Sequence, residues 1–150
     1  MTIRSARRFE AGALSALAVR SKAHWGYDAA FLELCRPELT LTESDLGRLV
    51  VRVAERDGEV VGMSALDVEA DPPRLDMLFV EPAAIGTGVG GDLYADACEQ
   101  ARARGLRALL VASDPNAEPF YLSRGAVRVG EDTSASTGRA LPLLRADLGS

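Results

Sequence analysis

The order of hydrophobic and polar positions predicts one strand and two helices near the N-terminus. Residues 2–6 are short and extended in character, so we expect a first strand there. From Phe9 the apolar residues recur three to four positions apart, which is typical of an amphipathic helix, and this helix should run to about Ser21. A second helix is expected over residues 28–36, with Asp28 as its N-cap and with Pro37 limiting it.

The middle of the chain carries the clearest strand signal. Residues 48–70 contain two β-branched runs on either side of Asp57-Gly58. This pair tolerates the positive φ of a tight turn and therefore predicts a β-hairpin. Residues 74–81 read as a third long strand, which Pro82 stops. Three consecutive strands of this kind favour antiparallel pairing.

The last third alternates helices and strands. We expect a helix over residues 88–104 with Gly105 as its left-handed C-cap, and then a buried strand over residues 106–113. A short helix follows, in which Asn116 as N-cap would place Pro119 in the first turn, and two closing strands span residues 126–132 and 139–148. The resulting order, β-α-α-β-β-β-α-β-α-β-β, indicates a mixed α/β sheet rather than a repeated βαβ unit.

Four glycines stand between the third strand and the long helix, in the stretch AAIGTGVGGDLYADA that begins at Ala83. Amides at a helix start and the helix dipole favour an anion, and glycine removes the Cβ atoms that would hold a phosphate away. Gly86, Gly88, Gly90 and Gly91 are therefore candidates for a pyrophosphate cradle. No Gly-Lys-Ser/Thr follows, which excludes a Walker loop. A dinucleotide fingerprint is nearly met but lacks a βαβ context, and a glycine turn without ligand stays an alternative.

Composition narrows the class of protein. A chain of 150 residues with 47% apolar and 26% charged residues suits one soluble domain, and the net charge of −5 argues against a general nucleic-acid binder. No apolar run approaches the ~18 residues of a membrane span, and no secretory signal is visible. Cys35 and Cys98 have no metal-ligand spacing, so we expect buried thiols in a reducing cytoplasm and no metal site.

Two motifs together resemble the GCN5-related N-acetyltransferase (GNAT) superfamily. LDMLFVEPAAIGTGVGGDLY, from Leu75, is similar to its acetyl-coenzyme A site, and DPNAEPFYLSRGA, from Asp114, is similar to its NxxAxxFYxxxGF motif. The resemblance covers nearly the whole chain. It implies a single domain over residues 1–150 with a mixed, mostly antiparallel sheet of about six to seven strands, a V-shaped splay, about four flanking helices, and acetyl-coenzyme A as cofactor.

The resemblance also implies a cofactor site. Backbone groups of Leu78 and Val80 would bond the acetyl and pantetheine amides, the glycine loop would hold the pyrophosphate, and residues of the second motif would border the pantetheine. The implied set is Leu78, Phe79, Val80, Ile85, Gly86, Thr87, Gly88, Val89, Gly90, Gly91, Asn116, Phe120 and Tyr121. Three positions depart from the family pattern. Ile85 replaces Arg or Gln, Asp114 replaces Asn and Ala126 replaces Phe, which bears on affinity rather than on the choice of cofactor.

Acetyl transfer from a thioester to an amine needs few groups. A backbone N–H on the splayed strand can stabilise the carbonyl oxygen, and a tyrosine can protonate the leaving thiolate. Tyr121 is the candidate general acid, although its ring could simply pack the short helix on the sheet. Asp76 and Glu81 are candidate general bases. They point to opposite faces, so only one can face the site, and we favour Asp76. Each could also be a solvated charge.

The acceptor is expected between the first two helices. His24, Trp25, Tyr27 and Asp28 could box a cationic amine, or could form a packed helix corner. We expect an enzyme that acetylates a primary amine of a small molecule or a protein N-terminus. The alternatives are use of another acyl-coenzyme A, a coenzyme A-binding module without turnover, and a dinucleotide-binding module. No nucleic acid or membrane partner is expected, and apolar residues in 139–148 would suit a homodimer.

Overall fold

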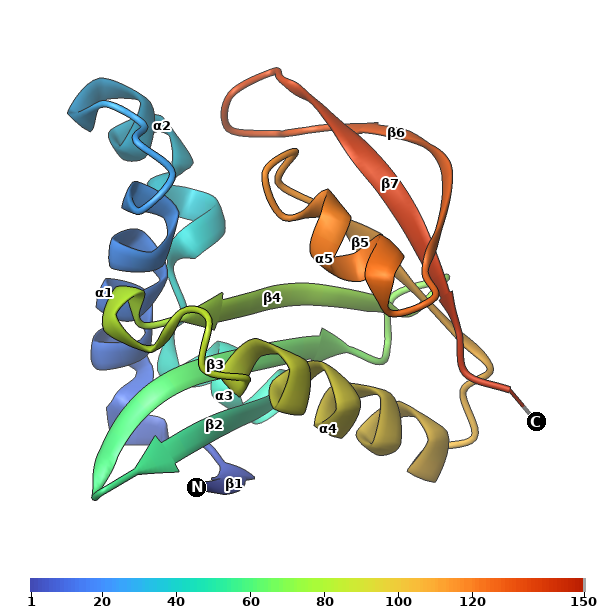
Figure 1. The fold of residues 1–150 in the computed structure, drawn as a ribbon, viewed down its shortest axis with the longest axis horizontal. Helices are drawn as coiled ribbons and strands as arrows, with labels where there is room; N and C mark the ends of the chain where they lie inside the picture. The colour runs from blue at the N-terminus through green and yellow to red at the C-terminus, as the bar shows by residue number, and fades with distance from the viewer. Residues whose placement is uncertain (150) are drawn as a thin grey trace.

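One mixed sheet of seven strands runs through the protein in the order β1-β2-β3-β4-β5-β7-β6, as Figure 1 shows. The computed structural model describes residues 1–149. Neighbouring strands are antiparallel except for β4 and β5, which are parallel. All seven predicted strands are present, and the mixed, mostly antiparallel sheet is confirmed. The strands are β1 (Thr2–Ser5), β2 (Val50–Arg56), β3 (Glu59–Asp67), β4 (Arg74–Val80), β5 (Ala108–Ala112), β6 (Val127–Thr133) and β7 (Ala140–Asp147).

The turn between β2 and β3 has the predicted conformation. Asp57 has φ of 53° and Gly58 has φ of 79°. Two positive φ values in succession match the twist of the flanking strands, which is why a hairpin closes over this Asp-Gly pair. The hairpin extends straight into β4, so β2, β3 and β4 form an antiparallel meander.

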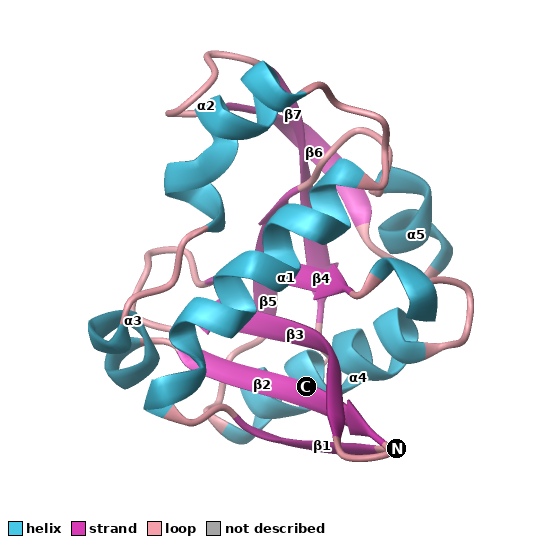
Figure 2. Ribbon diagram, turned by 90° about the vertical axis from the view of Figure 1, so that its left-hand side faces the viewer, coloured by secondary structure: helices cyan, strands magenta, loops and turns pink. Residues whose placement is uncertain are grey.

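Helices cover both faces of the sheet. On one face, Leu14 and Leu17 of α1 pack against Val53 of β2 and Met63 of β3, and Figure 2 shows α1 crossing these strands. On the other face, α4 packs through Leu93, which is fully buried. The helical segments are α1 (Ala11–Ala23), α2 (Ala29–Leu39), α3 (Glu43–Arg48), α4 (Val89–Ala103) and α5 (Glu118–Ser123), with 3-10 turns η1 (Arg8–Glu10) and η2 (Pro82–Ala84).

Three details of the predicted helices were wrong. The structure has five α-helices instead of about four, because α3 was missed. Pro37 does not limit α2. It lies inside the helix, which continues to the buried Leu39. Asn116 does not cap α5, since Ala117 holds that position, although Pro119 still falls in the first turn.

The sheet opens between β4 and β5. These strands share a single register pair, Arg74 with Leu110. On its other edge, β4 pairs regularly with β3 except at Asp76, where the register shifts by one residue. Such a bulge bends a strand, so β4 departs from β5 beyond this point. The V-shaped splay is confirmed, and the candidate site lies inside it.

Candidate active site

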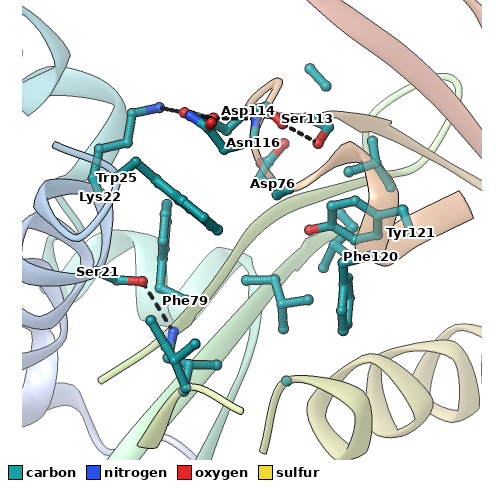
Figure 3. A pocket seen from close by; sticks show the side chains of 18 of the residues that line it. Ser21, Lys22, Trp25, Asp76, Phe79, Ser113, Asp114, Asn116, Phe120 and Tyr121 are labelled. Carbon is teal, nitrogen blue, oxygen red and sulfur yellow. Dashed lines mark hydrogen bonds and ion pairs between the residues drawn. The ribbon is translucent and has the colours of Figure 1, made fainter. Parts of the chain in front are cut away.

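The splay forms a cleft of about 520 Å³ between β4 and β5, shown in Figure 3. Its walls come from the end of α1, from β4, from the glycine loop (residues 85–91), from the end of β5 and from α5. Most of the residues predicted for the cofactor line it. They are Leu78, Phe79, Val80, Ile85, Gly86, Gly88, Gly90, Gly91, Asn116, Phe120 and Tyr121.

The edge of β4 that faces the cleft has backbone groups without strand partners. The Glu81 N–H donates to the Val61 carbonyl on β3 at 2.8 Å. Because hydrogen-bonding directions alternate along an antiparallel strand, the N–H and C=O groups of Leu78 and Val80 point the other way, toward β5. The Val80 N–H meets the Ser21 Oγ at 3.3 Å. Leu78 therefore presents its backbone groups to the cleft, and Val80 presents an amide held only by a side chain.

The glycine loop reaches the cleft with its backbone exposed. Gly86 and Gly88 have φ of 84° and 92°, a conformation that L side chains rarely adopt. Gly88 is the N-cap of α4, and no side chain among the described residues caps this helix. The first-turn amides of α4 are therefore open to an anion. Val89 is fully buried in the core and anchors the loop, and Thr87 accepts a hydrogen bond from Arg56 at 3.3 Å.

Tyr121 stands on the α5 side of the cleft. It is 6% exposed, and Figure 3 shows its hydroxyl directed toward the gap. Its ring packs edge-on against Tyr94 at 5.7 Å and Phe120 at 5.1 Å between centroids. Burial raises the pKa of Tyr121 above its ordinary value, so the hydroxyl keeps its proton at neutral pH. One side chain thus packs against the neighbouring aromatic rings and directs a protonated hydroxyl toward the cleft.

The two candidate bases occupy different environments. Asp76 lines the cleft, and its nearest cation is Arg74 at 4.0 Å. Burial against the cleft walls, followed by repulsion from Asp67, raises the pKa of Asp76. Glu81 instead accepts two hydrogen bonds from Arg20, at 2.7 and 2.8 Å, and these hold the pKa of Glu81 below its usual range. Asp76 is therefore the one of the two that faces the gap without a close partner.

The sequence of the chain matches a known family over most of its length. Residues 13–143 match the model of the acetyltransferase (GNAT) domain. The chain belongs to the GNAT acetyltransferase family. No curated protein matches it. As a GNAT protein it has a splayed sheet and a glycine loop of the kind described above.

Solved GNAT structures share the fold. The chain is 24% identical to a GCN5-related N-acetyltransferase from Rhodopseudomonas palustris (TM-score 0.83, covering 97% of this chain and 94% of that one). It is 18% identical to the PaiA N-acetyltransferase from Thermoplasma acidophilum in complex with coenzyme A (TM-score 0.81, covering 97% of this chain and 98% of that one). It is 25% identical to an N-acetylglutamate synthase from Neisseria gonorrhoeae complexed with coenzyme A and N-acetyl-glutamate (TM-score 0.73, covering 99% of this chain and 35% of that one).

The four predicted acceptor residues all lie at the corner between α1 and α2, but their side chains have different surroundings. Trp25 lines the GNAT cleft. His24 is exposed and meets the Trp25 ring edge-on at 5.4 Å. Asp28 is the N-cap of α2 and accepts from the Phe31 N–H at 2.8 Å. Tyr27 points its hydroxyl into a polar cluster rather than into the cleft.

That polar cluster, the Asp114 cluster (Lys22, Tyr27, Asp114, Asn116 and Arg139), was not predicted. Lys22 Nζ lies 2.8 Å from Asp114, and the Tyr27 hydroxyl donates to Asp114 at 2.9 Å. That hydroxyl accepts from Asn116 Nδ2 at 3.0 Å and from Arg139 Nη1 at 2.9 Å. Burial alone would raise the pKa of Asp114, but the bonds from Lys22, the Asn116 amide and Tyr27 lower it below its usual range. The cluster joins three loops, and three of its members, Lys22, Asp114 and Asn116, line the cleft.

Other residues at the cleft were also missed. Ser21, Lys22, Glu38 and Arg124 line it. The first three come from outside the two motifs, whereas Arg124 lies inside the second motif but was not among the candidate residues. The contacts of Glu38 with the Ser134 hydroxyl at 2.6 Å and of Arg139 with Tyr27 join residues far apart in the chain. No local spacing signals such pairs. At this end of the cleft the sequence had marked Trp25 and Tyr27 as candidate acceptor residues, Asn116 as a candidate cofactor residue, and Asp114 as a departure from the family motif.

Proposed function

We propose that this protein is an N-acetyltransferase that moves an acetyl group from acetyl-coenzyme A to a primary amine. The observation that carries the proposal is the gap between β4 and β5. It leaves the backbone of Leu78 without a strand partner, and the Val80 N–H held only by Ser21 Oγ, inside a cleft that also reaches the glycine loop. An extended chain with amide groups can pair with such a strand edge, and a diphosphate can sit on the amides of the loop.

The residues present fit this cofactor. Pantetheine is narrow and carries amides, which suits the free edge of β4 and the wall formed by Asn116 and Phe120. Positive φ at Gly86 and Gly88 lets the loop turn its backbone to the cleft. The similar structures from Thermoplasma acidophilum and Neisseria gonorrhoeae hold coenzyme A, which supports the same ligand here. Ser21 must release the Val80 N–H when a ligand pairs with it.

The chemistry follows from three groups of the chain. When bound, acetyl-coenzyme A supplies an acetyl group activated as a thioester. The Leu78 N–H stabilises the negative charge on the carbonyl oxygen. Asp76 takes one proton from the attacking amine, and the Tyr121 hydroxyl gives one proton to the departing sulfur. A C–N bond forms as the C–S bond breaks, so charge and protons balance.

The proposed acceptor is a primary amine of a small molecule or of a protein N-terminus. The structure of the Neisseria gonorrhoeae synthase with N-acetyl-glutamate supports a small-molecule amine. The lining of the cleft includes the carboxylates of Asp76 and Glu38 and the ring of Trp25. Carboxylates and an aromatic face attract a cationic amine before it is deprotonated.

Location and assembly form part of the proposal. Cys35 and Cys98 are both free and buried, which is in keeping with a reducing cytoplasm. Within residues 1–149 no helix could cross a membrane. A homodimer is proposed through the last hairpin. Because β7 pairs with β5 and β6 on both edges, such a contact would use β6, where Val127 and Val129 are each 45% exposed.

The test is an acetylation assay with a panel of primary amines, run on the wild type and on Tyr121→Phe. We expect kcat to fall about 10²–10⁴-fold in the variant with acetyl-coenzyme A affinity unchanged, because only proton donation is lost. Tyr94→Phe is the matched control, since Tyr94 packs on Tyr121 without lining the cleft. Binding of acetyl-coenzyme A without turnover on any amine would favour a non-catalytic module. Equal kcat in Tyr121→Phe would remove Tyr121 as the acid.

A further inference from the structure

We propose that Arg124 binds the diphosphate of coenzyme A and supplies the positive charge that the glycine loop itself lacks. The inference rests on the proposed function, since it takes coenzyme A as the ligand. Position 85, where the family usually has Arg or Gln, is Ile85 in this chain. The loop over residues 85–91 therefore contains no cationic side chain, and any charge for a diphosphate must come from elsewhere.

Arg124 lies at the right place without a partner. It follows α5 directly and lines the cleft together with the glycine loop. Its guanidinium lies 4.5 Å from the centroid of the Phe120 ring. Among residues 1–149 no carboxylate forms an ion pair with Arg124, whereas Arg20 pairs with Glu81 and Arg139 pairs with Asp114. An unpaired guanidinium held in place by stacking is ready for an external anion.

Gly91 gives independent support for this placement. A Cβ added at Gly91 would lie 3.1 Å from Arg124 Cζ and would overlap with Nη2. Gly91 stands in the first turn of α4 and does not have a positive φ, so the backbone there does not require glycine. Glycine costs about 1 kcal/mol relative to alanine inside a helix. The guanidinium fills the space that this glycine leaves, directly over the first turn of α4.

The chemistry fits a diphosphate. The planar guanidinium can donate two parallel hydrogen bonds to phosphate oxygens, which the compact ammonium of lysine cannot. A second cation, Arg56, reaches the loop and donates to the Thr87 hydroxyl at 3.3 Å. A diphosphate on the α4 amides would thus meet Arg124 on the side of the pantetheine wall, where Phe120 also stands.

The experiment measures dissociation constants of coenzyme A, 3′-dephospho-coenzyme A and pantetheine for the wild type, Arg124→Ala and Arg128→Ala. The chain has one tryptophan, and Trp25 lines the cleft, so its fluorescence reports binding and calorimetry repeats the measurement. We expect Arg124→Ala to weaken both nucleotides equally, by about ten- to a hundredfold, because a charge-assisted hydrogen bond is lost. Pantetheine, which has no phosphate, should bind the wild type and Arg124→Ala with the same affinity. Arg128 pairs with Glu118 and Glu131 outside the cleft, so Arg128→Ala should bind all three ligands as the wild type does.

A second variant acts on the same contact from the other side. Gly91→Ala should leave the fold at least as stable, since alanine is the better helix former, while it displaces the guanidinium and weakens coenzyme A. If the methyl group acts only through Arg124, Gly91→Ala combined with Arg124→Ala binds no more weakly than Arg124→Ala alone.

Three results would overturn the inference. An equal loss for pantetheine would mean that Arg124 supports the shape of the cleft. A loss for coenzyme A but not for 3′-dephospho-coenzyme A would assign Arg124 to the 3′-phosphate. Unchanged affinity for coenzyme A would mean that Arg124 makes no contact. These outcomes differ from failure of the proposed function, in which the wild type itself would not bind coenzyme A.

Discussion

The Tyr27 hydroxyl offers a sharp test of the Asp114 cluster. It donates to Asp114 and accepts from both Asn116 and Arg139, so one oxygen joins the α1–α2 corner to two other loops. Tyr27→Phe removes this oxygen and leaves the ring. The ring would keep its contact with Phe31 at 4.6 Å between centroids. Any change in stability therefore reports the hydrogen bonds and not the packing.

The size of the effect follows from which partners are left without bonds. Asp114 keeps Lys22 at 2.8 Å and the Asn116 N–H at 2.8 Å. Asn116 Nδ2 keeps Asp114 Oδ1 at 3.0 Å. Only Arg139 Nη1 loses its hydrogen bond outright. A hydrogen bond to a charged group contributes about 1.5–3 kcal/mol, so we expect Tyr27→Phe to lower the free energy of unfolding by about 2 kcal/mol. For a chain of this size that corresponds to a fall in Tm of about 4–8 °C.

Urea denaturation of the wild type, Tyr27→Phe, Arg139→Met and the double variant measures the loss in free energy of unfolding. It also shows whether that loss comes from the hydrogen bond between Tyr27 and Arg139. If the hydroxyl acts through Arg139, the two single losses do not add, with a coupling energy of about 1 kcal/mol or more. Additive losses, or a stability of Tyr27→Phe equal to the wild type, would refute the assignment. The looser corner should also raise KM for the acceptor amine while leaving acetyl-coenzyme A affinity unchanged.

Three further substitutions test the cleft and the packing beneath it. Asp76→Asn should lower kcat/KM about 10²–10⁴-fold at neutral pH. Since the fold raises the pKa of Asp76, ionisation of this carboxyl costs stability as pH rises through that pKa. The same variant should therefore have a higher Tm than the wild type at neutral pH and the same Tm in acid. A gain in Tm that grows in acid would contradict this. Gly62→Ala should lose about 1–3 kcal/mol, because the new Cβ would meet Leu93 Cδ1 at 2.7 Å and the Phe79 carbonyl at 3.2 Å. On the same strand, the buried Ser64 hydroxyl has no hydrogen-bond partner within residues 1–149, so Ser64→Ala should raise the free energy of unfolding by about 1 kcal/mol. Chemical denaturation of both variants against the wild type should therefore show changes of opposite sign.

Local patterns in the sequence predicted the elements well, and tertiary contacts account for the exceptions. α2 continues past Pro37 because only one hydrogen bond is lost there, while the next residues are fixed by the fold. Leu39 is buried, and Glu38 is held by the Ser134 hydroxyl at 2.6 Å. The missed helix α3 did carry a local signal in the sequence, because Thr42 and Asp45 have the three-residue spacing of a capping box. In the structure the two residues form the reciprocal hydrogen bonds of that motif.

The candidate site could be predicted only where its residues follow one another in the chain. β4, the glycine loop and the start of α5 form continuous motifs, and the resemblance marked them. The cleft also draws on Lys22 of α1 and Glu38 of α2, and Arg139 of the last hairpin supports this part of it by donating to the Tyr27 hydroxyl. Their meeting depends on how α1, α2 and the last hairpin pack. Arg124 lay inside a recognised motif, but its role follows from its contact with Gly91, which only the fold reveals.

The gap beside β4 has a consequence for the exchange of amide hydrogens with solvent. Along β4 the amides alternate between the hydrogen-bonded ladder with β3 and the open cleft, so Met77 and Phe79 should exchange slowly and Leu78 quickly within one continuous strand. Val80 should fall between them, since Ser21 Oγ holds its N–H at 3.3 Å. Rapid amide exchange in the central strand of a seven-stranded sheet would show that one side of this strand has no strand partner, as at the edge of a sheet. Ligand binding should remove the alternation, and the strand would then exchange as an interior strand does.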